Sequence, residues 1–183
     1  MNILLSADLP HSIQPRLASL CFGLQQVQWL EEGDFYLNLR SFGKLSPNEL
    51  DAIRIRLKYL FFHPLPMTLE GIGHHHQRSN RGMIWAGIKR SLPLEQLKKE
   101  IDHLLKDLSL PSEAPSQLMV PLGYYERLNP DKLNDYLIDR AHFQSQPFEI
   151  QSCSLRLMRA TPKRMFFERL EQYSASPQIS GED

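Results

Sequence analysis

The stretch that decides the fold reads Phe35-Tyr36-Leu37-Asn38-Leu39-Arg40-Ser41-Phe42-Gly43. We interpret residues 34–42 as a β-strand that pairs with residues 26–30 around the turn 31–34. Residues i and i+2 of a strand point to the same face, so Tyr36 and Asn38 lie together on one face. Any chemistry that this strand carries therefore depends on these two side chains.

Predicted strands and helices alternate along the rest of the chain. Strands are expected over residues 3–7, 67–72, 83–88, 118–122, 148–158 and 165–172, and a polar loop over 73–81. A first helix opens at Asp8 and Pro10 and carries the apolar residues Ile13, Leu17, Leu20 and Leu24. Further helices are expected from the capping box Ser46-Pro47-Asn48-Glu49, over 93–107, and after the cap Asn129-Pro130-Asp131. The order predicts an α+β fold with two pseudo-symmetric lobes, each an antiparallel sheet backed by helices.

Composition indicates an ordinary soluble globular protein. The 183 residues suit one domain, placed over residues 1–173, with a flexible tail over 174–183. The 21 basic and 21 acidic residues cancel, which argues against a strongly cationic surface that coats nucleic acid. The N-terminus lacks the basic start of a signal peptide, and no apolar run approaches the roughly 20 residues of a membrane span. We expect a cytoplasmic monomer without membrane contact, in which Cys21 and Cys153 are reduced thiols.

Separated segments of the chain resemble the bacterial 2'-5' RNA ligase / RNA 2',3'-cyclic phosphodiesterase family, which is part of the two-histidine (2H) phosphoesterase superfamily. The segments are Leu4-Leu5-Ser6-Ala7-Asp8-Leu9-Pro10, the strand over 35–43, Met67-Thr68-Leu69-Glu70-Gly71-Ile72-Gly73, Met83-Ile84-Trp85-Ala86-Gly87-Ile88 and Phe148-Glu149-Ile150. They agree in order and spacing, and the likeness covers roughly residues 3–173. It implies the fold of the family, in which a central cleft lies between the two lobes.

The resemblance implies that catalysis depends on two His-x-Thr motifs, one on a strand of each lobe. In the family one imidazole takes a proton from the attacking oxygen and the other gives one to the leaving oxygen, while the threonines donate hydrogen bonds to the phosphate. In the first motif Tyr36 stands for the histidine and Asn38 for the threonine. In the second, the preferred register puts Met119 and Pro121 at these positions, and a shifted register puts Gln117 and Met119 there. Neither register supplies a histidine.

These substitutions predict a degenerate member of the family. Tyrosine, with an ordinary pKa of about 10, is a poor general base at neutral pH, whereas asparagine can still donate to a phosphate oxygen. We expect a cleft that binds an RNA end, a nucleotide or another phosphorylated small molecule without acid–base catalysis. The candidate ligand-binding residues are Tyr36, Asn38, Arg40, His74, His75, His76, Arg78 and Arg81. Neither a cofactor nor a metal site is expected.

Two other interpretations remain open. The chain is an active cyclic phosphodiesterase if a histidine of the loop that carries His74, His75 and His76 replaces the missing imidazole together with Tyr36. It is a partner-binding scaffold if Tyr36 and Asn38 are packing residues in a closed groove.

Arginines near the expected cleft are candidates for binding phosphate, because a guanidinium donates two parallel hydrogen bonds. The family's loop arginine is displaced here: Gly82 takes its position and Arg81 precedes it. The alternative is that Arg40, Arg78 and Arg81 are solvated charges. A further basic cluster is expected to form a solvated face, and its members are Arg156, Arg159, Lys163 and Arg164.

Overall fold

Strands and helices alternate along the residues that the computed structural model describes, 2–77, 81–110, 118–161 and 164–177. The strands are β1 (Asn2–Asp8), β2 (Val27–Trp29), β3 (Tyr36–Lys44), β4 (Leu65–Met67), β5 (Leu69–Gln77), β6 (Arg81–Ile88), β7 (Val120–Glu126), β8 (Phe148–Ile150), β9 (Ser152–Ala160) and β10 (Met165–Ser174). The helices are η1 (His11–Ile13), α1 (Gln14–Ala18), α2 (Pro47–Leu57), α3 (Leu92–Leu105) and α4 (Pro130–Asp139).

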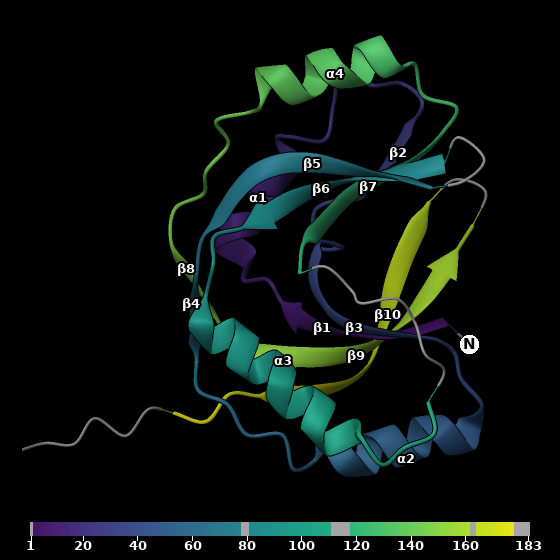
Figure 1. Ribbon diagram of the computed structural model, residues 1–183, viewed down its shortest axis with the longest axis vertical. Helices are drawn as coiled ribbons and strands as arrows, with labels where there is room; N and C mark the ends of the chain where they lie inside the picture. Colours follow the sequence, from purple (N-terminus) through teal and green to yellow (C-terminus); the bar gives the residue numbers. More distant parts are fainter. Residues whose placement is uncertain (1, 78–80, 111–117, 162–163, 178–183) are drawn as a thin grey trace, which may run out of the picture.

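Within these residues the strands form two four-stranded antiparallel sheets and a two-stranded ladder. Sheet A has the order β10-β9-β1-β3, sheet B has the order β2-β7-β6-β5, and β4 pairs with β8. Figure 1 shows α4 on the far side of sheet B, and α2 and α3 on the far side of sheet A. The predicted α+β fold of antiparallel sheets backed by helices is confirmed. Sheet A combines strands from the two ends of the chain, whereas the strands of sheet B lie between Val27 and Glu126, so the lobes are not successive halves of the sequence.

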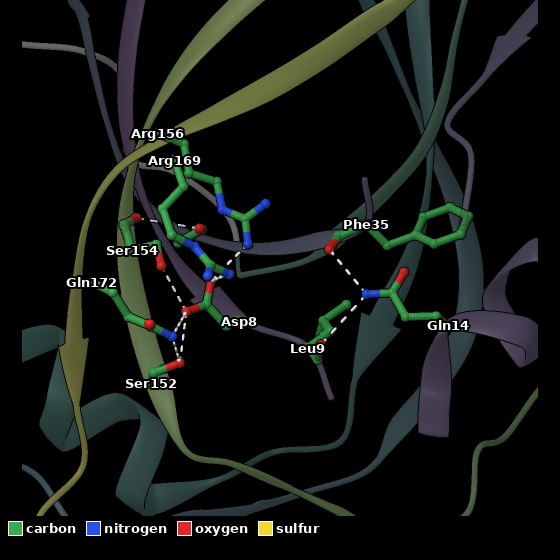
Figure 2. A network of polar contacts seen from close by, with 10 residues as sticks. Asp8, Leu9, Gln14, Phe35, Ser152, Ser154, Arg156, Arg169 and Gln172 are labelled. Carbon is green, nitrogen blue, oxygen red and sulfur yellow. Dashed lines mark hydrogen bonds and ion pairs between the residues drawn. The ribbon is translucent and has the colours of Figure 1, made fainter. Parts of the chain in front are cut away.

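The predicted pairing of residues 26–30 with residues 34–42 is wrong. β2 pairs with β7 in sheet B, whereas β3 pairs with β1 in sheet A. The chain crosses between the sheets at a turn in which Gly33 has a φ of +98°, a conformation that favours glycine. The Gln14 side chain holds this crossing, since it accepts from the amide of Gly33. It also donates to the carbonyl oxygen of Phe35, a contact that Figure 2 shows. The predicted turn is present, but it joins two sheets instead of closing a hairpin.

Helix starts follow the predicted caps. The Ser46 hydroxyl accepts from the amide of Glu49, and the Glu49 carboxylate accepts from the amide of Ser46, which completes the capping box of α2. At α4 the Asn129 side-chain oxygen accepts from the amides of Asp131 and Lys132. The first helix is shorter than predicted: α1 ends at Ala18, and the chain reaches Leu24 through turns that still bury its apolar side chains. No helix in the described ranges has the length and apolar composition needed to cross a membrane.

The polar loop predicted over 73–81 is in part a strand. His74, His75 and His76 belong to β5 and pair with residues of β6. β5 is the outer strand of sheet B, where exposed polar side chains are compatible with strand pairing. A run of identical polar residues carries no alternation, so the sequence pattern does not predict this part of the strand.

The C-terminal boundary also differs from the prediction. β10 runs to Ser174, and the amides of Ala175 and Ser176 donate 2.8 Å hydrogen bonds to the carbonyl oxygens of Gln151 and Phe62. Residues 174–176 therefore belong to the folded part of the chain, contrary to the boundary set at residue 173. The remainder of the predicted tail, from residue 178, lies outside the described residues.

Candidate functional site

The two strands that carry the degenerate motifs touch each other between the sheets. The backbone amide of Asn38 in β3 donates to the carbonyl oxygen of Met119, the residue before β7, over 3.3 Å. Met119 is only 5% exposed, and Pro121 is buried as well. The apolar pair of the preferred register therefore lies in the protein interior. Gln117, the partner in the shifted register, lies outside the described residues.

Tyr36, which replaces the first histidine, is a core residue with an exposed fraction of 4%. Its ring packs against Phe167 of β10, with ring centroids 4.4 Å apart. Its hydroxyl lies 3.3 Å from the hydroxyl of Tyr124 in β7, so the contact spans the two sheets. Burial, together with the neighbouring Tyr124, raises the pKa of Tyr36 well above its ordinary value, although the charge of Arg156 opposes the shift. At neutral pH this phenol is protonated and cannot act as a base.

The donors predicted for phosphate in β3 already have protein partners. Asn38 Nδ2 donates to the Ser41 hydroxyl over 3.2 Å, and Asn38 Oδ1 is buried with no partner among the described residues. Arg40 forms a 2.8 Å ion pair with Asp102 of α3, and its guanidinium lies 5.6 Å from the ring centroid of Phe42. The structure therefore directs Arg40 towards α3 and ties the Asn38 amide to its own strand.

Strand pairing shows which face of sheet B looks towards sheet A. Tyr124 touches Tyr36 of sheet A, so the face that carries Tyr124 is the face between the sheets. Tyr124 pairs with Met83, and Met83 pairs with His75. Directly paired residues place their side chains on one face. His75 therefore lies on the inter-sheet face, where its ring centroid is 6.2 Å from that of Trp85.

The neighbours of His75 alternate to the opposite face of β5. The Nδ1 atom of His74 lies 3.5 Å from the Tyr125 hydroxyl on that face. The three histidines lie at exposed positions, but His75 points to the opposite face of β5 from His74 and His76. Arg81 forms a 2.8 Å ion pair with Glu126, and both side chains are more than 60% exposed. Arg78 lies outside the described residues.

Sequence reasoning missed a buried polar cluster around Asp8 (Figure 2). The Asp8 carboxylate accepts hydrogen bonds from the hydroxyls of Ser152 and Ser154 at 2.7 Å each, from Arg156 Nη2 at 2.6 Å and from Gln172 Nε2 at 3.3 Å. Four donors on β9 and β10 thus converge on the last residue of β1. The cluster fastens the N-terminal strand to the C-terminal hairpin of sheet A.

Arg156 departs from the solvated face that was predicted for it. The residue is 7% exposed, and its Nε is buried with no partner among the described residues. Burial alone would raise the pKa of Asp8, but the hydrogen bonds from the two serines and Arg156, with the charge of Arg156, leave that pKa below its ordinary value. A signal was present in the sequence, since Ser152, Ser154 and Arg156 recur at the period of a strand.

The described part of the chain contains no set of side chains arranged to bind a metal ion. No group of three or more histidine, cysteine, aspartate or glutamate side chains is placed there to hold an ion. Cys21 and Cys153 are both free thiols.

Comparisons with known proteins agree with the family resemblance seen in the sequence. No protein-family model matches the chain. An RNA 2',3'-cyclic phosphodiesterase from Archaeoglobus fulgidus is 21% identical over 176 residues, which cover 94% of this chain and 99% of that protein. E. coli LigT complexed with 3'-AMP has a TM-score of 0.73 at 14% identity, covering 96% of this chain and 98% of LigT. The protein TT0787 of Thermus thermophilus also has a TM-score of 0.73 at 14% identity, covering 95% and 97%.

Further crystal structures of E. coli LigT, complexed with ATP and with NADP+, have a TM-score of 0.66 each. At these identities the solved structures show a shared fold, and the similarity extends over nearly the whole of each chain. The chain therefore has the fold of LigT, and the resemblance to the two-histidine phosphoesterase superfamily that its sequence suggested is confirmed.

Proposed function

We propose that this chain is a LigT-like protein that binds a phosphorylated ligand between its two sheets without hydrolysing it. The observation that carries the proposal is that Tyr36, at the position of a catalytic histidine in the family, is buried and bound to other side chains. Its side chain stands where the family has its first histidine, is buried against Phe167, and shares its hydroxyl contact with Tyr124.

The missing proton transfers explain why turnover is not expected. The raised pKa of Tyr36 keeps its hydroxyl protonated, and Met119 has no proton to exchange. One positioned acid or base contributes roughly 10²–10⁴-fold in rate. Two such groups act as a unit, so their losses do not multiply. Either loss alone would reduce the reaction to a small fraction of the family's chemistry.

The proposed ligand is a nucleotide or an RNA end. Support comes from E. coli LigT, which has been crystallised with 3'-AMP, ATP and NADP+. In this chain the proposed surface for such a ligand is the part of the inter-sheet face on β5 and β6. The side chains of His75, Trp85 and Arg81 lie on this same face of sheet B. Arginine and aromatic rings suit phosphate and base respectively. A cytoplasmic monomer, as the sequence predicts, is compatible with this ligand.

A second candidate is an enzyme that uses His75 in place of the family histidines. The observation that favours it is the position of His75, which is exposed and is the member of the histidine run that faces sheet A. Imidazole titrates near neutral pH and can act as acid or base.

Hydrolysis and binding can be measured on the same purified protein. 2',3'-cyclic AMP and a short RNA that ends in a 2',3'-cyclic phosphate are followed by phosphorus NMR, and the melting temperature is recorded with and without AMP. We expect no ring opening above the uncatalysed rate, and a rise in melting temperature with AMP that falls in His75→Ala. His76→Ala, one position away on the opposite face, is the matched control.

Two results would change the conclusion. Hydrolysis that is lost in His75→Ala and kept in His76→Ala would replace the proposal with the second candidate. Absence of both hydrolysis and any nucleotide effect that depends on His75 would contradict ligand binding between the sheets.

A further inference from the structure

A hollow of about 550 Å³ lies between α1 and the C-terminal end of α4, away from the inter-sheet face. Pockets for small molecules range from about 300 to 1,000 Å³, so the hollow is large enough for a mononucleotide. The residues that give it chemical character are Arg16, Phe22, Asp139, Arg140, His142 and Phe143. A second hollow of about 460 Å³ adjoins it and shares Phe22, Asp139 and Arg140.

Arg140 is held at the boundary of the two hollows by aromatic rings. Its Cζ lies 4.0 Å from the ring centroid of Tyr136 and 4.7 Å from that of Phe22. Its Nη1 donates to the carbonyl oxygen of Tyr136 over 3.4 Å. It forms no ion pair with any residue in the described ranges, so its other N–H groups are available. Packing on rings pre-organises a guanidinium for hydrogen bonds in its own plane.

Phe22 presents an exposed ring at the rim of both hollows. It is 62% exposed, so most of the ring is accessible to a ligand. The segment that carries it is anchored, because the Tyr136 hydroxyl donates a 2.7 Å hydrogen bond to the carbonyl oxygen of Leu20. The amide of Phe22 donates to the same carbonyl over 3.0 Å. A fixed, exposed ring is a platform on which a flat ligand can stack.

Arg16 supplies a second cation to the larger hollow. Its Cζ lies 5.3 Å from the ring centroid of Phe143, and it too forms no ion pair among the described residues. Phe143 is itself fixed, since its carbonyl oxygen accepts a 2.8 Å hydrogen bond from Gly71. Asp139 is the acidic residue of the lining, so two guanidinium groups and one carboxylate leave an excess of positive charge.

We propose that this hollow binds a phosphorylated nucleoside, with the base stacked on Phe22 and the phosphate held by Arg16 and Arg140. Guanidinium forks match phosphate oxygens, and the neighbouring exposed ring selects a ligand that carries a planar group beside the phosphate. A free nucleotide and the phosphorylated end of an RNA strand are two sources of this chemistry. The site is separate from the inter-sheet face of the proposed function, because it is built from α1, α4 and the segments that follow them.

Binding of four probes to the full-length protein tests the site: AMP, adenosine, inorganic phosphate and a short 5'-phosphorylated single-stranded RNA, each by calorimetric titration. The variants are Arg16→Gln, Arg140→Gln and Phe22→Leu, with Arg90→Gln as the control, since Arg90 is 80% exposed on its side chain and pairs with Glu95 far from the hollow. We expect AMP to bind more tightly than adenosine or phosphate. Each of the three variants weakens AMP binding about tenfold, and the control leaves it unchanged.

The results distinguish a free nucleotide from an RNA end as the ligand, and this hollow from the inter-sheet face as the binding site. RNA that binds while AMP does not identifies an RNA end as the ligand, and equal binding identifies the nucleotide itself; both support the site. With His75→Ala as the background, so that the inter-sheet face does not contribute, AMP or RNA binding that is unchanged in Arg16→Gln, Arg140→Gln and Phe22→Leu overturns the proposal, as does failure of every probe to bind. Binding that is lost in His75→Ala alone belongs to the inter-sheet face and overturns this proposal while supporting the proposed function. Arg16 is exposed, so Arg16→Gln remains a valid test if Arg140→Gln proves unstable.

Discussion

The backbone amide of Asn38 donates a 3.3 Å hydrogen bond to the carbonyl oxygen of Met119, so the two strands at the degenerate motif positions are joined directly. The hydroxyl contact between Tyr36 and Tyr124 adds a second link across the sheets. In a protein that processes a phosphodiester at these positions, the same space must admit the substrate. Here backbone and side chains of the protein occupy it at the motif positions, and the proposed ligand surface is the part of the inter-sheet face on β5 and β6.

Replacement of Tyr36 separates packing from hydrogen bonding. Tyr36→Ala is expected to lower the free energy of unfolding by about 3–5 kcal/mol, because it leaves a cavity beneath Phe167. Tyr36→Phe, which removes the contact with Tyr124 alone, should cost about 0.5–1.5 kcal/mol. Urea denaturation measures both. Tyr59→Ala, at a residue that is 74% exposed, is the control, and equal losses at the two tyrosines would show that Tyr36 is not a core residue.

Because Asp8 and Arg156 form a buried ion pair, neutralising Asp8 should strongly lower the stability of the protein. Asp8→Asn should destabilise the protein by about 3–5 kcal/mol, because Arg156 then stays buried without its counter-charge. The matched control is Asp102→Asn, which breaks the exposed ion pair with Arg40 and should cost at most about 1 kcal/mol. The comparison uses urea denaturation at neutral pH, and a smaller effect at Asp8 than at Asp102 would contradict the cluster.

The same carboxylate predicts a dependence on pH. The pKa of Asp8 in the folded protein lies below its ordinary value of 3.8, so ionised Asp8 stabilises the fold fully at pH values above that ordinary value. This stabilisation is lost as the pH falls through the lowered pKa. The difference in unfolding free energy between the wild type and Asp8→Asn should therefore be constant above about pH 5 and shrink in stronger acid. A difference that grows on acidification would give the pKa shift the opposite sign.

Gly82 occupies the position of the family's loop arginine, and the structure leaves no room for a side chain there. A Cβ at this position would collide with the Tyr125 ring and lie 2.5 Å from the carbonyl oxygen of His75. Gly82→Ala should lower the unfolding free energy by about 1–3 kcal/mol, and Gly82→Arg by at least as much, without creating a phosphate site. Melting temperatures provide the measurement, with Glu126→Ala at a neighbouring exposed position as the control.

Restoring the two family histidines should not restore hydrolysis. The double variant Tyr36→His, Met119→His places both imidazoles at positions that are at most 5% exposed. A substrate cannot reach them while Phe167 and Tyr124 cover the first position. The assay is ring opening of 2',3'-cyclic AMP, and a rate clearly above that of the wild type would show that the space between the sheets opens in solution.

Local signals in the sequence predict the individual elements well. The capping box at Ser46 and the cap at Asn129 mark helix starts that the structure confirms, because capping depends on residues within one turn of each other. The partners of β2 and β3 could not be read in this way. Their pairing depends on which distant strand covers each backbone edge, and the turn at Gly33 has the same composition whether it closes a hairpin or joins two sheets.

The resemblance predicts which strands carry the candidate site, but it does not predict that the site residues are buried. Tyr36 and Asn38 are found on the strand where they were expected, whereas the burial of Tyr36 depends on Phe167, more than a hundred residues away. The Asp8 cluster was missed for the same reason, since its four donors come from two strands at the other end of the chain. A polar strand residue looks the same in sequence whether it faces water or a buried partner.

The place of β1 between β3 and β9 has a consequence for biosynthesis. Ser6 and Ser154, which are hydrogen-bonded neighbours in sheet A, are 148 positions apart in the chain. While the protein is being made, β1 can pair with β3 early, but its other edge stays unpaired until β9 has left the ribosome. Such long-range pairing slows folding, and an open strand edge invites association with other chains. The nascent chain is thus most vulnerable to aggregation until β9 is made, because β9 is the strand that covers the free edge of β1.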